Sequence, residues 1–182
     1  MIYVLLGATC SGKTTTLETL IRQGHQTVIS YTTRPKRPNE IDGVDYHFVT
    51  QDYFEWLDES GLLVAKNSFR SAFGDIWSYA INSQDIKLFE DQIVITEPSG
   101  YRDLTEKYGS NNVVGIYLMT PYDVRLARGL NRKDNSDELL RRLAADERDF
   151  EGFELEVDYT IVSVDKDQVI EDILNIMNGD IK

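Results

Sequence analysis

Short apolar runs alternate along this chain with segments whose apolar residues recur at helical spacing. The clearest runs cover residues 2–6, 92–97, 113–119 and 159–162. Runs of this length that are rich in β-branched residues are typical of strands buried on both faces. Residues 62–65 and 68–81 are predicted to form further strand and turn. We expect Pro98, Ser99 and Gly100 to close the strand at 92–97.

Helices are predicted between these runs. Leu17, Leu20 and Ile21 predict a helix that Gly24 ends. The other predicted helices cover 50–60 with Thr50 as cap, a short segment capped by Ser83, 121–130 opened by Pro121, 137–150 and 168–177. Strands that alternate with helices predict parallel βαβ units and a three-layer α/β fold.

Composition restricts the function. The chain has 182 residues with 31 acidic and 19 basic side chains, a net charge of −12 and one cysteine. Such a chain repels nucleic-acid backbones and anionic membranes, so we expect neither as a partner. A lone cysteine is consistent with a reducing, cytoplasmic location. Residues 1–182 are expected to form one domain.

The segment after the first strand predicts a phosphate-binding loop. Gly7, four residues, Gly12, Lys13 and Thr14 fit the P-loop signature between a buried strand and a helix. Glycines let backbone N–H groups point at phosphate oxygens, and the helix N-terminus adds its positive dipole end. Lys13 would reach the β- and γ-phosphates and the Thr14 hydroxyl would bind Mg²⁺. The residues expected to contact ATP are Gly7, Ala8, Thr9, Cys10, Ser11, Gly12, Lys13, Thr14 and Thr15.

A second anion site is indicated by residues 30–48, which we name the acceptor loop. It carries three basic residues within four positions, together with several hydroxyl groups. Arginine suits bidentate phosphate recognition. The spacing of Thr32, Thr33, Arg34, Arg37, Glu40, Gly43, Tyr46 and Phe48 resembles the signature of the guanylate kinases.

The resemblance implies roles for the acceptor loop. Arg34, Arg37 and Tyr46 would hold the phosphate of the acceptor monophosphate, Glu40 would support the arginines and Ser30 would touch the base. It also implies core segments 1–30, 92–125 and 143–182, a monophosphate-binding region 31–91 and a mobile lid 126–142.

The lid arginines would close over the triphosphate. Arg128 and Arg132 are four residues apart, on one face of a helix. Either Arg142 or Arg141 matches the third lid arginine. Such groups neutralise charge on the transferring phosphoryl group.

The chain departs from the family pattern in the expected base pocket. An ungapped alignment places Val64 where the family has an acid that pairs with guanine. Phe73 falls on a family tyrosine at the phosphate, and Asp75 falls on a serine or threonine. Asp75, Asn67 or Glu97 could replace the missing acid, and Glu97 could instead support Mg²⁺.

The resemblance therefore implies a nucleoside monophosphate kinase with a P-loop kinase fold, in which Mg²⁺ assists and ATP is the phosphate donor. GMP or dGMP is the expected acceptor. Another monophosphate remains an alternative, as does a guanylate-kinase-like binding module without catalysis. The chain is expected to act as a monomer or homodimer.

Overall fold

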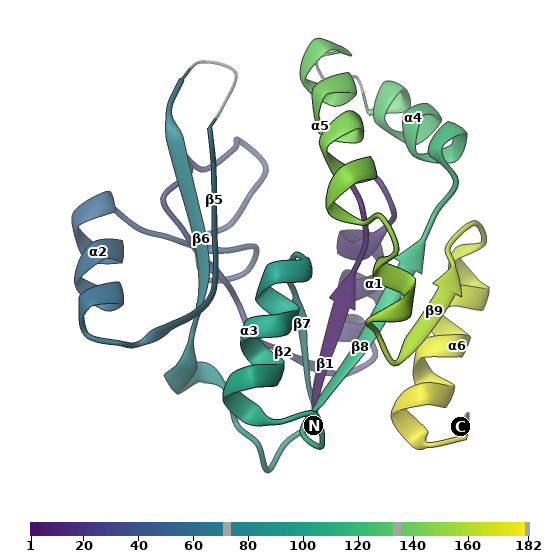
Figure 1. The fold of residues 1–182 in the computed structure, drawn as a ribbon, viewed down its shortest axis with the longest axis horizontal. Coiled ribbons are helices and arrows are strands. Elements are labelled where there is room, and N and C mark those ends of the chain that lie inside the picture. Colours follow the sequence, from purple (N-terminus) through teal and green to yellow (C-terminus); the bar gives the residue numbers. More distant parts are fainter. Residues whose placement is uncertain (71–73, 133–135, 181–182) are drawn as a thin grey trace. The chain divides into compact units, whose positions relative to one another are not determined.

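Figure 1 shows a computed structural model, which describes residues 1–70, 74–132 and 136–180. The strands are β1 (Ile2–Leu6), β2 (Gln26–Thr27), β3 (Tyr31–Thr32), β4 (His47–Phe48), β5 (Leu63–Arg70), β6 (Ile76–Asn82), β7 (Gln92–Ile95), β8 (Val113–Met119) and β9 (Tyr159–Val162). The α-helices are α1 (Lys13–Arg22), α2 (Gln51–Glu59), α3 (Pro98–Tyr108), α4 (Tyr122–Asn131), α5 (Ser136–Asp149) and α6 (Lys166–Asn178). Two 3₁₀ helices cover Ser83–Asp85 and Phe153–Leu155.

The fold is α/β with a central parallel sheet, as predicted. Its strand order is β2-β7-β1-β8-β9, and the pairs β2–β7 and β8–β9 run parallel. A second sheet has the order β4-β3-β6-β5. The chain divides into two compact units, one comprising Met1–Ile2 and Gln26–Val113 and the other Tyr3–His25 and Val114–Lys182. No helix within the described ranges is long and apolar enough to cross a membrane.

In the unit that holds the P-loop, a fully buried strand leads directly into a helix. All five residues of β1 are buried, which explains why the run is apolar without alternation. α1 begins at Lys13 after Gly12, whose φ of 105° lies in the left-handed region. Glycine adopts this conformation without strain, so it can turn the chain from strand to helix within a few residues.

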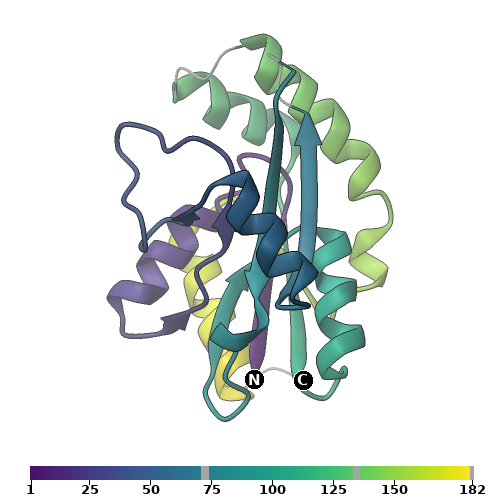
Figure 2. The ribbon, with the colours of Figure 1, turned by 90° about the vertical axis from the view of Figure 1, so that its left-hand side faces the viewer.

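In the other unit, α2 covers one face of the second sheet (Figure 2). Thr50 begins the helix, and its side chain accepts a hydrogen bond from the Tyr53 N–H. The buried side chains on the helix contact buried strand residues in one apolar cluster, which contains Phe54, Leu57, Leu63 and Ala80. The Thr50 cap predicted from the sequence is confirmed.

A long antiparallel hairpin, β5–β6, forms most of the second sheet. Its register shifts between Val64 and Asn67, and Ala65 within this irregularity has a φ of 53°. Val64 pairs with Ile81, and Asn67 pairs with Tyr79. Three positions on β5 therefore correspond to two positions on β6, so β5 contains one extra residue here. The bulge therefore keeps these four side chains on one face of the hairpin.

Two local predictions are wrong. Pro98 does not close a strand but is the first residue of α3, a position where its missing N–H and fixed φ are favourable. The sequence hides α3 because only Tyr101 and Leu104 form its large buried apolar side chains. Asn82, rather than Ser83, caps the short helix, and its Oδ1 accepts from the Gln84 N–H.

Candidate functional site

The P-loop forms a closed turn whose lysine is tied to the loop itself. Lys13 Nζ donates to the carbonyl oxygen of Gly7 and to that of Ala8 at 3.2 Å. A Cβ at Gly7 would collide with Ser11 Oγ, so this position requires glycine for space. Lys13 therefore has carbonyl partners within the loop that a phosphate can replace.

Arg128, on α4, binds the backbone of the P-loop. Its guanidinium donates to the carbonyl oxygens of Cys10 at 3.3 Å, Ser11 at 3.1 Å, Ser163 at 3.2 Å and Val164 at 3.1 Å. Four carbonyl acceptors fix the guanidinium in one orientation. Arg128 therefore joins the P-loop to the segment after β9 in this structure.

The other lid arginines lie in different surroundings. Arg132 is exposed and its guanidinium lies 3.2 Å from Cys10 Sγ. Arg141 and Arg142 both bind the carboxylate of Glu138 at 2.8 Å. These hydrogen bonds, from Arg141 first, lower the pKa of Glu138 to about 2. Both candidates for the third lid arginine thus bind Glu138, Arg141 through Nε and NH2 and Arg142 through Nε, and neither contacts the P-loop in any interaction described.

The start of α1 can accept Mg²⁺. Thr14 lies in the first turn of the helix with its side chain exposed to solvent. Mg²⁺ takes few protein ligands and completes its octahedral shell with water and substrate phosphates. The exposed Thr14 hydroxyl beside the P-loop fits this pattern, whereas the described residues contain no group of three metal-binding side chains. Thr15 is also exposed.

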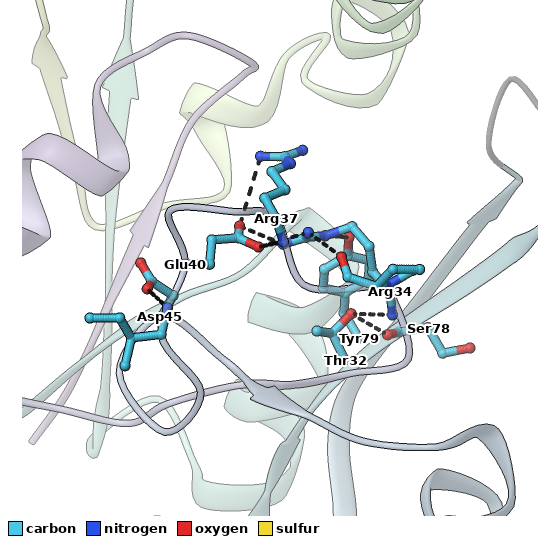
Figure 3. Close-up of polar contacts among 9 residues, drawn as sticks. Thr32, Arg34, Arg37, Glu40, Asp45, Ser78 and Tyr79 are labelled. Atoms are coloured by element: carbon cyan, nitrogen blue, oxygen red, sulfur yellow. Dashed lines mark hydrogen bonds and ion pairs between the residues drawn. The ribbon is translucent and has the colours of Figure 1, made fainter.

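The acceptor loop is organised around a buried arginine (Figure 3). The Arg34 side chain is 5% exposed and forms a bidentate pair with Glu40. Its NH1 lies 2.9 Å from Glu40 Oε2 and its NH2 lies 2.7 Å from Oε1. Glu40 also accepts from the Arg37 N–H at 2.8 Å. Although burial would raise the pKa of Glu40, the hydrogen bond from Arg34 and the other contacts leave it lowered.

Arg37 differs from Arg34 in being available to a ligand. Its side chain is 60% exposed and reaches Glu40 only at 3.9 Å. Figure 3 shows it extending away from the other labelled side chains. Because Arg34 is surrounded by protein acceptors, Arg37 is the arginine of this loop that a phosphate can bind with less rearrangement.

Tyr79 is a site residue that the sequence analysis missed. Its hydroxyl accepts a hydrogen bond from Arg34 Nε at 3.1 Å, although 45 residues separate the two. Its ring centroid lies 5.8 Å from that of Tyr46, which itself lies beneath the Arg34 guanidinium at 5.5 Å. Desolvation raises the pKa of Tyr46, so the phenol stays protonated at neutral pH and can donate a hydrogen bond.

The sequence signal that could have pointed to Tyr79 is the alternation of side chains between the two faces of β6. Tyr79 lies opposite Asn67, and Ser78 lies on the other face, where its hydroxyl meets that of Ser68. The ungapped alignment chose Phe73 instead, and this residue lies outside the described part of the chain.

The remaining predicted residues lie in the unit of the acceptor loop. Ser30, the residue before β3, is half-buried, and its carbonyl oxygen accepts a hydrogen bond from the His47 N–H at 2.9 Å. Glu97 is half-buried and forms the N-cap of α3, while Asp75 is exposed. Val64 is 7% exposed and pairs with Ile81, so this part of the hairpin is apolar.

Comparison with known proteins identifies the family. The guanylate kinase family profile matches residues 1–180. A guanylate kinase from Alkalilimnicola ehrlichii is 30% identical over 94% of this chain and 85% of its own length. One from Rhodopseudomonas palustris is 30% identical over 99% and 83% of the two chains.

A solved structure agrees with these relatives. The fold resembles the crystal structure of guanylate kinase from Anaplasma phagocytophilum, with a TM-score of 0.72, 22% identity and coverage of 99% of this chain and 85% of that chain. This likeness concerns the fold, and the family assignment rests on the profile and the sequence relatives. The chain belongs to the guanylate kinase family.

Proposed function

We propose that this chain transfers the γ-phosphoryl group of ATP to the phosphate of GMP or dGMP, yielding ADP and the corresponding diphosphate. The observation that carries the proposal is the Arg34–Glu40 pair with the exposed Arg37 beside it, in a chain that also has a complete P-loop. One element suits the acceptor phosphate and the other suits the donor triphosphate.

The acceptor phosphate binds at the acceptor loop in this proposal. Arg37 supplies a flexible cation, and Tyr46 and Tyr79 supply hydroxyl groups beside the fixed Arg34. Tyr79 thereby takes the place that the alignment gave to Phe73. Ser30, Glu97 and Asp75 are the polar candidates for contact with the base.

The donor triphosphate binds at the P-loop. Lys13 exchanges the Gly7 and Ala8 carbonyl oxygens for phosphate oxygens, and backbone N–H groups of the P-loop point at the phosphates. Mg²⁺ bound through Thr14 and the phosphates would offset negative charge on the transferring group.

The acceptor phosphate is already a nucleophile near neutral pH, so catalysis needs alignment and charge neutralisation rather than a general base. The lid arginines, Arg128, Arg132 and Arg142 or Arg141, contribute to this neutralisation. In this proposal the Arg128 guanidinium either leaves its carbonyl partners to contact the phosphates, or stays bound to these carbonyl groups and keeps the P-loop in place. The chain is proposed to act in the cytoplasm as a monomer or homodimer, without nucleic acid or membrane.

A second acceptor is favoured by one observation. Val64 and its partner Ile81 are 7% and 1% exposed and offer no group to the hydrogen-bonding edge of guanine. A site that lacks partners for a base's donors discriminates poorly, since hydrogen bonds to charged groups contribute about 1.5–3 kcal/mol each. A monophosphate with another base is therefore the alternative substrate.

The test is a coupled ADP-release assay with Mg·ATP against GMP, dGMP, AMP, CMP, UMP and dTMP, with the Lys13→Ala variant as the blank. We expect the highest kcat/KM with GMP or dGMP. Turnover of another monophosphate would move the assignment to the alternative. No turnover above the blank would refute the kinase and leave the binding-module alternative.

A matched pair of variants tests the acceptor site. Arg37→Ala should raise KM for the monophosphate by about tenfold, the loss of one charged hydrogen bond, and leave KM for ATP unchanged. The neighbouring Lys36, also exposed, is the control because Lys36→Ala removes the same charge from the same loop. Equal effects of the two variants would contradict the role of Arg37.

A further inference from the structure

A carboxylate on α5 binds the backbone of the P-loop. The Thr9 N–H donates to Asp146 Oδ2 at 2.6 Å, across 137 residues of sequence. The Asp146 side chain is 15% exposed, so water competes little for this bond. A charged acceptor and a short distance make this one of the stronger hydrogen bonds to the loop.

A buried arginine on α4 holds the carboxylate in place. Arg125 is 5% exposed, and its NH1 lies 3.7 Å from Asp146 Oδ2. Its NH2 pairs with Glu147, and its Nε donates to the Thr120 carbonyl oxygen at 3.1 Å. The guanidinium is thus anchored through Nε and NH2, and NH1, which makes no hydrogen bond to any described residue, interacts with Asp146 as an ion pair. A charge buried this deeply needs a counter-ion and hydrogen bonds to offset the cost of its desolvation.

The P-loop contains a strained residue next to this contact. Cys10 has a φ of 64°, a left-handed conformation that is disfavoured for any residue with a Cβ. Such strain persists only where the surroundings over-determine the backbone. The preceding residue, Thr9, is held by Asp146 through its backbone N–H, and the carbonyl oxygen of Cys10 itself is held by Arg128 at 3.3 Å.

We propose that Asp146, oriented by Arg125, is a positioning residue that holds Cys10 in its left-handed conformation and so keeps the P-loop shaped for a triphosphate. Asp146 acts through the Thr9 backbone and touches no reacting atom. The inference rests on the proposed function for its kinetic consequence, because it adds a positioning residue to the ATP side of that reaction. The acceptor side does not depend on it.

The experiment measures binding of Mg·ATP by calorimetry and KM for both substrates in four variants of the full chain. Asp146→Ala should weaken ATP binding and raise KM for ATP by about tenfold, the loss of a charge-assisted hydrogen bond, with KM for the monophosphate unchanged. Asp146→Asn keeps an oxygen acceptor and should stay within about threefold of the wild type. Asp149→Ala, on an exposed position of the same helix, controls for the loss of negative charge and should change neither constant.

The fourth variant separates a positioning role from a general structural one. Glycine adopts the left-handed conformation without strain, so Cys10→Gly added to Asp146→Ala should restore most of the lost ATP affinity. A residue that only supported the fold of α5 would show no such rescue. If Asp146→Ala does not fold, as judged by circular dichroism, Asp146→Asn with and without Cys10→Gly gives the same comparison in a milder form.

Several results would overturn the proposal. Tighter ATP binding by Asp146→Ala would show that the carboxylate mainly repels phosphate. Equal losses in Asp146→Ala and Asp146→Asn, or no rescue by Cys10→Gly, would also exclude it. Failure of the proposed function is distinguishable, because a wild-type chain without turnover can still lose ATP affinity on Asp146→Ala.

Discussion

Replacing Glu40 with glutamine tests whether the acceptor loop depends on its buried ion pair. Glu40 binds both NH1 and NH2 of Arg34 and the Arg37 backbone N–H, and the two paired side chains are only 5% and 15% exposed. Glu40→Gln keeps the shape and one acceptor oxygen but leaves the Arg34 charge without a counter-ion.

The magnitude follows from that burial. Removing one partner of a buried pair typically costs about 3–5 kcal/mol because the remaining charge stays buried. Glutamine still accepts one hydrogen bond, so we expect a loss of about 2–3 kcal/mol in the free energy of unfolding. KM for the monophosphate should rise as well, because Arg34 is no longer held beside Tyr46.

Urea unfolding at pH 7.5, followed by circular dichroism, measures the change. Glu18→Gln is the control, since Glu18 is 57% exposed and pairs with Arg22 at 3.9 Å. Exposed pairs contribute about 0–1 kcal/mol. A Glu40→Gln variant that unfolds within about 0.5 kcal/mol of the Glu18→Gln control would refute the reasoning.

The pH dependence of the same variant gives an independent check. The pKa of Glu40 is lowered in the folded protein, so its ionised form stabilises the fold above the unfolded pKa of about 4.5, and this contribution is lost as the pH falls through the folded value. The stability difference between wild type and Glu40→Gln should be constant above about pH 5.5 and shrink below about pH 4.5.

The other predictions concern three positions. Tyr79→Phe should raise KM for the monophosphate and cost about 1–2 kcal/mol in urea unfolding, because Arg34 Nε loses its acceptor; unchanged values for both would show that Tyr79 only packs. Glu138→Gln should lower stability by about 1 kcal/mol after allowance for its half-exposed arginine partners. Because the pKa of Glu138 is about 2, this difference should persist at neutral pH and diminish between about pH 4.5 and pH 2, and a difference that grew on acidification would contradict it. Gly129→Ala should destabilise the chain by about 1–3 kcal/mol, since its Cβ would lie 2.7 Å from Leu139 Cδ2 in a buried contact between α4 and α5; an unchanged melting temperature would show that Leu139 can move aside.

The P-loop and its neighbouring elements were predictable because the signal is local. A buried strand, two glycines, a lysine and a threonine occupy 13 consecutive positions from residue 2 to residue 14, and each element's conformation is set by its own residues. The Arg34–Glu40 pair was implied by the resemblance to the guanylate kinases, and its partners are six residues apart in one loop.

The contacts between distant segments could not be predicted in this way. Helix α3 was missed because its few buried side chains give a weak pattern, and its single strong signal, Pro98, also suits a turn. The register of the β5–β6 hairpin, with its shift between Val64 and Asn67, depends on packing rather than on local preference.

The sequence by itself therefore determined the α/β architecture, the phosphate-binding loop and the cationic acceptor loop, because periodicity and motif spacing are properties of short segments. Only the tertiary structure decided that Tyr79 binds Arg34 and that Asp146 binds Thr9, over separations of 45 and 137 residues. The physical reason is that such hydrogen bonds depend on strand register and helix packing. These features are set by the burial of side chains from many elements at once, and no single segment of the chain encodes them.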